Sequence, residues 1–221
     1  MSSTRLLFAH ATGLCSEVWR NVIHAKDSDL LRYAVRAFDF RGHGSRGGEC
    51  LTGTSGPPSW DDFAVADVLE AASSLRVGGG GGCCRVVGVG HSMGGAALVK
   101  AELAAPGTFA ALVLCEPILI SNDIPFDEED GEEAGKGGVV AASPNISTAA
   151  SGSKRRKSSF SSHPLAVRAA KRRSRWESRA AAREYFEARP MFRSWDAAAV
   201  EGYCEGGLQP ATHDDEAAAV A

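Results

Sequence analysis

One short stretch of the sequence has the residue types and spacing to present a nucleophile. It reads Gly90-His91-Ser92-Met93-Gly94, a G-x-S-x-G pattern that follows an apolar, β-branched run and precedes an alanine-rich segment. Between a strand and a helix, this pattern predicts a sharp turn that lifts the serine hydroxyl clear of the sheet. Cβ atoms at positions 90 and 94 would collide with the neighbouring strand and helix, and the serine must hold a strained backbone. The alternative interpretation is a glycine-rich turn that only packs tightly.

A serine at this turn can attack a carbonyl carbon if an oxyanion site and a base lie beside it. We expect the Met93 N–H, at a helix N-terminus, to face the developing oxyanion. The base must lie within hydrogen-bond reach of Ser92. His91 is expected to point away from the serine and His24 to lie on an exposed helix. Neither is an obvious base.

The elements around this turn alternate in the order of a parallel α/β sheet. Apolar and alternating runs predict strands at 5–10, 33–40, 85–90 and 109–115, and helices at 17–25, 60–76 and 93–105. Strand and helix in strict alternation build parallel strands with right-handed crossovers. We therefore expect an α/β fold, a three-layer α/β/α sandwich with a mainly parallel sheet.

The composition is that of a globular protein with one ordinary domain. The chain has 221 residues, an apolar fraction of 44% and a net charge of −3, which implies no polyanionic partner for the whole chain. No apolar stretch reaches roughly 18 residues and no secretory signal follows Met1, so we expect a soluble protein without a membrane span. Six cysteines without C-x-x-C spacing favour reduced thiols in the cytoplasm over disulfides or a zinc site.

The composition changes after residue 122. An acidic run at 127–133 and a Gly/Ser/Ala-rich stretch precede two basic clusters, 154–157 and 171–175. Sparse apolar content with segregated charge predicts a disordered insertion over 123–175. We interpret the clusters as part of a solvated linker, with a nuclear-import signal or a nucleic-acid patch as the alternatives. Nucleic acid is therefore not the expected partner.

Two helix-forming segments follow this insertion. Residues 176–189 end at Pro190, and residues 195–205 end before a pair of glycines. Both segments carry aromatic side chains that need a surface to pack on. The expected organisation is a core at 1–122, the insertion at 123–175, a helical part at 176–208 and a disordered tail at 209–221.

Three separated blocks have an order and spacing that are typical of one protein family. They read FAHATG at 8–13, DFRGHG at 39–44 and GHSMGG at 90–95. With these blocks, residues 5 to about 120 resemble the α/β-hydrolase superfamily in its cytosolic esterase/lipase-like branch. Ser92 argues against the similar dehalogenase and epoxide-hydrolase branches, which place aspartate at this position.

The resemblance implies roles for individual residues. The first block supplies the second oxyanion N–H, which by position falls on Thr12 beside that of Met93. Ala11 departs from the glycine that is more usual there. His10 and His43 belong to loop motifs in which histidine braces a loop more often than it transfers a proton. The helical part would form a partial cap over the pocket, and packing of its aromatics against the body is the alternative.

The C-terminal part departs from the family pattern. The family orders its triad as serine, acid and histidine, with the histidine after the last strand. No strands corresponding to the last two follow here, so we expect a truncated product or an incomplete gene model. Glu116 is the substitute for the acid, with a structural Glu-Pro turn as the alternative. His213 is last in chain order, as a triad histidine should be, but sits in a polar tail.

The function that the resemblance implies is hydrolysis of a carboxylic ester or related acyl bond through a Ser92 acyl-enzyme. A small hydrophobic ester is the implied substrate, and no metal or organic cofactor is implied. Loss of the histidine segment would leave such an enzyme inactive. The competing interpretation is a non-catalytic, hydrolase-like protein that binds a ligand or a partner. The sequence does not predict the oligomeric state.

Overall fold

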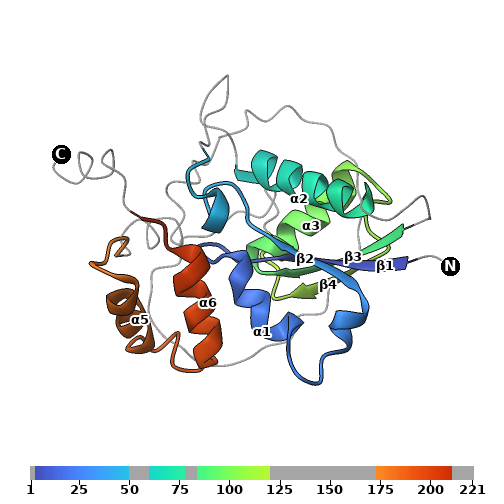
Figure 1. Ribbon diagram of the computed structural model, residues 1–221. Helices are drawn as coiled ribbons and strands as arrows, with labels where there is room; N and C mark the ends of the chain where they lie inside the picture. The colour runs from blue at the N-terminus through green and yellow to red at the C-terminus, as the bar shows by residue number, and fades with distance from the viewer. Residues whose placement is uncertain (1–2, 50–59, 78–83, 120–172, 211–221) are drawn as a thin grey trace, which may run out of the picture. The chain divides into compact units, whose positions relative to one another are not determined.

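A four-stranded parallel sheet organises the N-terminal part of the chain. The computed structural model describes residues 3–49, 60–77, 84–119 and 173–210. Its strands are β1 (Ser3–Ala9), β2 (Ala34–Phe38), β3 (Cys84–His91) and β4 (Ala111–Cys115), in the order β2-β1-β3-β4 (Figure 1). The register pairs Ala9 with Phe38 and with Gly90. The carboxyl ends of these strands therefore meet at one edge of the sheet, and all four predicted strands are confirmed.

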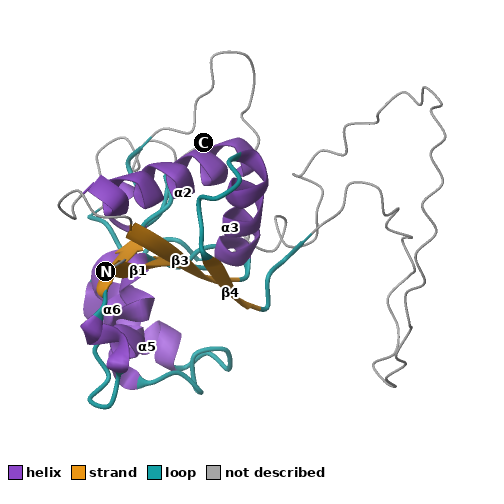
Figure 2. Cartoon of the chain, turned by 90° about the vertical axis from the view of Figure 1, so that its right-hand side faces the viewer, coloured by secondary structure: helices purple, strands orange, loops and turns teal. Residues whose placement is uncertain are grey.

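The sheet has a helical layer on each face, as the alternation of elements predicts. The long helices α2 (Trp60–Val77) and α3 (Met93–Ala104) cover one face (Figure 2). On this face the strand residues Leu7 and Val86 pack in the same core as both helices. On the other face lie the 3₁₀ turn Ser16–Trp19 and α1 (Arg20–Ile23). Strand residues point alternately to the two faces. The three-layer α/β arrangement is confirmed.

The apolar run at 109–115 is typical of a buried strand, but in the structure most of this strand is exposed, so a buried strand is the wrong interpretation. Phe109 is buried, but four of the five residues of β4 are exposed, and only Leu112 is half-buried. The reason lies in the sheet order, because among the described strands β4 pairs with β3 alone. An apolar run indicates a strand, but it does not say whether a neighbour will cover it.

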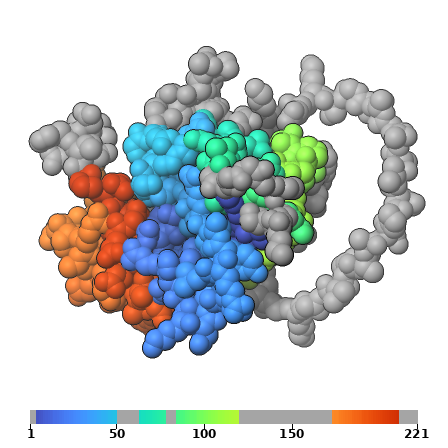
Figure 3. All heavy atoms as spheres, turned by 45° about the vertical axis from the view of Figure 1, so that its right-hand side comes forward, coloured from blue at the N-terminus to red at the C-terminus, as the bar shows by residue number. Residues whose placement is uncertain are grey.

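Two C-terminal helices pack against the segment that follows β1. Helix α5 (Arg179–Glu187) begins at Ser178, whose side chain accepts from the Ala181 N–H, and α6 (Ala197–Gly207) begins in the same way at Asp196. Figure 3 shows this orange-to-red segment directly against the blue N-terminal segment. They share a cluster whose buried members are Ala11, Leu14, Cys15, Ala182, Phe186, Phe192, Val200, Tyr203 and Cys204. The predicted helices exist, and their aromatics pack on the body.

The chain divides into two compact units, one of residues 1–120 with 176–221 and one of residues 121–175. Of the insertion predicted at 123–175, only 173–175 are described, so its disorder and both basic clusters stay predictions. The tail residues 211–221, including His213, also lie outside the described residues. Within the ranges that the structure describes, no helix has the length and apolarity to cross a membrane.

Candidate active site

Ser92 occupies a strained turn between β3 and α3. Its φ of 53° and ψ of −115° lie in a region that L-residues rarely adopt, and it is the N-cap of α3. The Ser92 N–H donates to the carbonyl oxygen of Cys115 at 2.9 Å, and its own carbonyl accepts from the Ala96 N–H at 3.1 Å. Bonds to β4 on one side and to α3 on the other therefore hold the strained conformation.

The two glycines of the motif are required by close backbone contacts. A Cβ on Gly90 would lie 2.6 Å from the backbone nitrogen of Gly95, in the first turn of α3. A Cβ on Gly94 would lie 2.4 Å from the carbonyl oxygen of Ala9 and 2.6 Å from that of His10. The predicted collisions with helix and strand are confirmed. The same contacts place the loop that follows β1 against the first turn of α3, next to Ser92.

Two backbone amides are available on this side of the serine. Met93 is the first residue of α3, where N–H groups have no partner within the helix and the helix dipole is positive. Thr12 is exposed in a tight turn that the Leu14 N–H closes on the Ala11 carbonyl at 3.1 Å. The Thr12 N–H finds no acceptor among the residues that the structure describes. These are the two amides that the sequence predicts for an oxyanion site.

His10 is a buried brace. Its side chain is fully buried, its Nδ1 bonds to the Ala11 carbonyl at 2.9 Å, and its Nε2 accepts from the Phe40 N–H at 3.3 Å. Burial lowers the pKa of His10 to about 4, although the nearby Asp39 carboxylate, 3.8 Å away, favours the protonated form. The imidazole is therefore neutral at pH 7, and both of its nitrogens are occupied by backbone groups.

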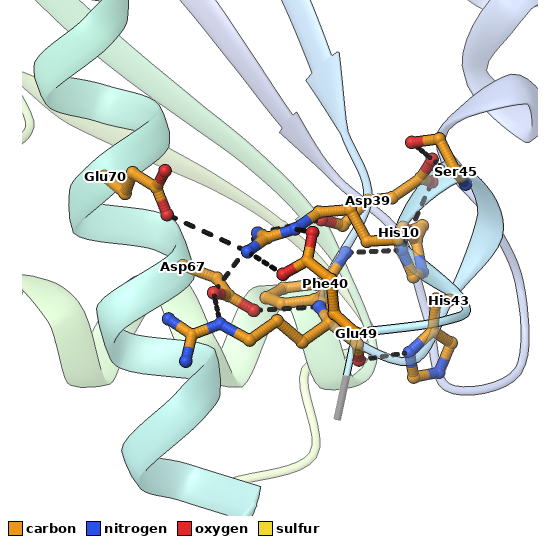
Figure 4. Close-up of polar contacts among 10 residues, drawn as sticks. His10, Asp39, Phe40, His43, Ser45, Glu49, Asp67 and Glu70 are labelled. Atoms are coloured by element: carbon orange, nitrogen blue, oxygen red, sulfur yellow. Dashed lines mark hydrogen bonds and ion pairs between the residues drawn. The ribbon is translucent and has the colours of Figure 1, made fainter. Parts of the chain in front are cut away.

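His43 braces the same loop from the other side. Its Nε2 accepts from the Gly13 N–H at 3.2 Å, and its Nδ1 lies 3.2 Å from the Arg41 carbonyl oxygen. The loop that carries His43 is fixed by Asp67 of α2 (Figure 4), whose buried carboxylate accepts from the Arg41 N–H at 2.9 Å and from its Nε at 2.7 Å. Arg46 approaches the same carboxylate to 3.2 Å.

Asp39 ties this loop to the segment after β1. The buried carboxylate accepts from the Ser16 N–H at 2.6 Å. It also accepts from the N–H and the hydroxyl of Ser45 at 2.8 and 2.7 Å (Figure 4). Burial disfavours its charge, but the hydrogen bonds from Ser16 and Ser45 outweigh burial and hold the pKa of Asp39 below its usual value. A Cβ on Gly44, whose φ is +49°, would lie 2.5 Å from this carboxylate. Asp39 and Gly44, both in the DFRGHG block at 39–44, thus hold this loop against the segment after β1.

Asp67 is a residue that the sequence analysis missed. It lies among buried residues of α2, with Ala64 before it in the sequence and Val68 and Ala71 after it. A carboxylate in an apolar helical stripe needs a partner, and the arginines of residues 41–46 supply it. A charged residue among the apolar residues of a predicted helix was therefore the signal in the sequence that a partner had to be found for it.

The acid and base of a triad are not assembled by the described residues. Glu116 follows β4 directly, with a φ of 46°, and its side chain is exposed. The carbonyl oxygen of its neighbour Cys115 accepts a hydrogen bond from the Ser92 N–H. Glu116 therefore lies at the edge of the sheet where Ser92 is found. No histidine of the described ranges is hydrogen-bonded to Ser92: His24 is exposed, and His91 is half-buried at the end of β3. Nor does any group of three or more His, Cys, Asp or Glu side chains in those ranges form a metal site.

The chain was compared with known proteins by sequence and by structure. No curated protein gives a significant sequence match. Among solved structures, the peroxisomal α/β-hydrolase Lpx1 of Saccharomyces cerevisiae is similar over 93% of this chain and 50% of its own, with 19% identity and a TM-score of 0.61. The chain thus spans half the length of that protein. A lipase-esterase related protein of Clostridium acetobutylicum aligns with 52% of this chain and 42% of its own, at 22% identity and a TM-score of 0.41.

The sequence also matches a family over almost its full length. The family is described as the Alpha/beta hydrolase family, and its sequence model matches residues 6–219. The match includes the elbow at Ser92, both braced loops and the two C-terminal helices. This chain therefore belongs to the α/β-hydrolase family.

Proposed function

We propose that this protein is a serine hydrolase that cleaves a carboxylic ester or a related acyl bond through an acyl-enzyme on Ser92. The observation that carries the proposal is the backbone of Ser92, with its φ of 53° and ψ of −115° at the N-terminus of α3. Such strain costs about 1–3 kcal/mol and persists where the surrounding structure enforces it, most often at functional sites. Here the backbone hydrogen bonds of Ser92 to Cys115 and Ala96 enforce it, and Gly90 and Gly94 permit it, because neither position has room for a Cβ.

The chemistry that fits this turn is nucleophilic acyl transfer. The Ser92 Oγ attacks the carbonyl carbon and gives its proton to a base, and the oxyanion that forms accepts from the Met93 and Thr12 N–H groups. When the tetrahedral intermediate collapses, the bond from carbon to the leaving oxygen breaks and the alcohol leaves with that proton. Water then attacks the acyl-enzyme, the carboxylic acid is released, and the proton returns to Ser92. No metal or organic cofactor takes part in this sequence.

The base of this mechanism comes from outside the braced loops. His10 and His43 each use their ring nitrogens to hold backbone groups, and the pKa of His10 is lowered to about 4 by burial. We keep His213 as the proposed base and Glu116 as the proposed acid. Without a histidine, only the smaller acceleration from binding and the oxyanion site would remain.

The substrate class follows from the same site. A small hydrophobic ester suits a serine that lies beside two backbone amides and the loop of the buried, neutral His10. The oxyanion site carries no formal charge, so it favours a carbonyl oxygen that becomes negative over one that is already charged. Nucleic acid has no part in this proposal.

The test is covalent labelling of the purified protein with a fluorophosphonate probe, read by intact mass, with Ser92→Ala as the control. We expect labelling of the natural sequence that is lost in Ser92→Ala. We also expect His213→Gln and Glu116→Gln to slow hydrolysis of a short-chain aryl ester while leaving the fold intact. A folded protein that neither reacts with the probe nor hydrolyses the ester would contradict the proposal.

That negative result would support the second function, a non-catalytic hydrolase-like protein that binds a ligand or a partner. One observation favours it: in the ranges that the structure describes, no histidine is hydrogen-bonded to Ser92. A calorimetric titration with a short-chain ester would then separate ligand binding from loss of function. Binding without turnover in both the natural sequence and Ser92→Ala would establish it.

A further inference from the structure

We propose that Tyr203 of α6 is a positioning residue for the Thr12 amide of the oxyanion site. The proposal rests on the proposed serine hydrolysis, because it gives the Thr12 N–H its task. It adds that the task depends on a residue that lies 190 positions away in the sequence from the loop it contacts. Tyr203 itself does not touch the reacting atoms; it acts through Gly13.

The contact joins the tyrosine to the backbone of the oxyanion loop, residues 10–14. The Tyr203 hydroxyl donates to the Gly13 carbonyl oxygen at 2.9 Å, and its ring is buried in the aromatic cluster shared with α5. The N–H of the same glycine donates to His43 Nε2 at 3.2 Å. Both polar groups of the Gly13 backbone are therefore held by side chains, one from each side of the loop.

This arrangement fixes the two peptide planes that follow Thr12. The plane between Thr12 and Gly13 contains the N–H that His43 binds, and the plane between Gly13 and Leu14 contains the carbonyl that Tyr203 binds. The Leu14 N–H in that second plane closes the turn on the Ala11 carbonyl. Gly13 has a φ of 70°, a left-handed conformation. The Thr12 N–H lies in the preceding peptide plane, and the Ala11 carbonyl of that plane accepts from the Leu14 N–H and lies 2.9 Å from His10 Nδ1. Because Leu14 belongs to the plane that Tyr203 binds, the direction of the Thr12 N–H depends on how Gly13 is held.

Helix α6 is seated closely enough to make Tyr203 a rigid tether. A Cβ on Gly202 would lie 2.9 Å from the carbonyl oxygen of Glu17, so this turn of the helix lies directly on the backbone of the segment that follows the loop. One turn further, a Cβ on Gly206 would lie 3.3 Å from the sulfur of Cys15. At the surface, Arg20 forms an ion pair with Glu205 at 2.8 Å. Tyr203 therefore reaches Gly13 from a helix that cannot retreat without losing these contacts.

The loop that is tethered in this way is also the one that touches the elbow. The His10 carbonyl oxygen would lie 2.6 Å from a Cβ on Gly94, in the first turn of α3. A small shift of the loop would thus change where the Thr12 N–H lies relative to Ser92. Oxyanion donors act through fixed geometry, and complete loss of one donor lowers the rate by roughly 100–1000-fold. Loosening a donor should cost less, on the order of tenfold.

The experiment compares Tyr203→Phe with Tyr185→Phe, which removes the same hydroxyl from the same aromatic cluster on α5. The first readout is hydrogen exchange, by mass spectrometry, of peptides that cover residues 10–15. The second is the kinetics of fluorophosphonate labelling at Ser92, separated into the maximal rate and the half-saturating concentration. For Tyr203→Phe we expect faster exchange in this loop and a maximal labelling rate about tenfold lower, with half-saturation unchanged. Tyr185→Phe should change neither.

Each outcome separates this inference from the proposed function. Unchanged loop exchange in Tyr203→Phe would overturn the positioning role, and so would equal losses of labelling in both variants. If the natural sequence is not labelled at all, the proposed serine hydrolysis fails. In that case, faster exchange confined to Tyr203→Phe would still support the tether as the element that fixes this loop.

Discussion

The two sides of the elbow are built very differently. On the side of β1, the carbonyls of Ala9 and His10 contact the first turn of α3, and buried side chains fill the space around it. On the side of β4, Val113 and Leu114 are 51% and 37% exposed, and Glu116 is exposed as well. Ser92 and the two amides of the proposed oxyanion site belong to the first side, whereas the proposed acid belongs to the second. The strained serine therefore packs against β1 and α3, and its backbone hydrogen bonds to Cys115 and Ile118 are its links to the more exposed side.

The largest effect should come from a methyl group added on the β1 side. In Gly94→Ala the Cβ would lie 2.4 Å from a carbonyl oxygen, so strand and helix must separate. We expect unfolding free energy to fall by about 3 kcal/mol or more and labelling at Ser92 to be lost. Gly107→Ala, before β4, meets no atom within 4 Å and only strains a φ of +84°, so about 1 kcal/mol is expected. Urea denaturation measures both, and similar losses would contradict the comparison.

Truncating one leucine on each side sharpens the same contrast. Leu98 of α3 is fully buried against β3, and Leu98→Ala should destabilise the protein by about 3 kcal/mol through the cavity it leaves. Leu114 of β4 is 37% exposed, so Leu114→Ala should cost less than about 1 kcal/mol. A large loss in Leu114→Ala would show that β4 is covered more completely than its exposure indicates.

The burial of His10, in the loop that follows β1, predicts that the unfolding free energy depends on pH. Burial lowers its pKa from 6.5 to about 4, so the unfolded chain binds the proton first as pH falls. The stabilisation is fully present above pH 6.5 and is lost as pH falls through this window towards 4. Between pH 7 and pH 5 the loss should be about 2 kcal/mol. Urea denaturation should show that His10→Gln loses less unfolding free energy over this pH range than the natural sequence does. His24 is exposed, so His24→Gln should lose as much as the natural sequence.

The smallest effects concern Ser92 and Glu116, the two non-glycine residues with positive φ in the part of the chain that the structure describes, one on each side. Ser92→Gly relieves a φ of 53° with an unusual ψ, so thermal unfolding should show a gain of about 1 kcal/mol together with loss of labelling. Glu116→Gly relieves a φ of 46° on an exposed turn and should gain only a few tenths of a kcal/mol. A loss of stability in Ser92→Gly would mean that the serine side chain contributes to the fold.

The parts of the fold that the sequence predicts well depend on contacts between near neighbours. Strands and helices alternate because apolar runs and helix-forming runs alternate. The elbow can be recognised because Gly90 and Gly94 each lie two residues from Ser92. The contacts that complete the site are not readable in this way. Asp67 meets the 41–46 loop, and Tyr203 meets Gly13, across long stretches of sequence. A single sequence states that these residues have polar groups, but not which backbone each one will meet.

The hydrogen bond from Tyr203 to Gly13 has a consequence for the order in which the chain folds during its synthesis. A chain emerges from the ribosome from its N-terminus, and segments begin to fold as they appear. The four strands are complete by residue 115, so the elbow can form while the second half of the polypeptide is still being translated. The Gly13 carbonyl, in contrast, must wait for a partner 190 residues downstream. The first loop to be synthesised is therefore among the last to reach its final conformation, because its Gly13 carbonyl is bonded only after α6 has been made.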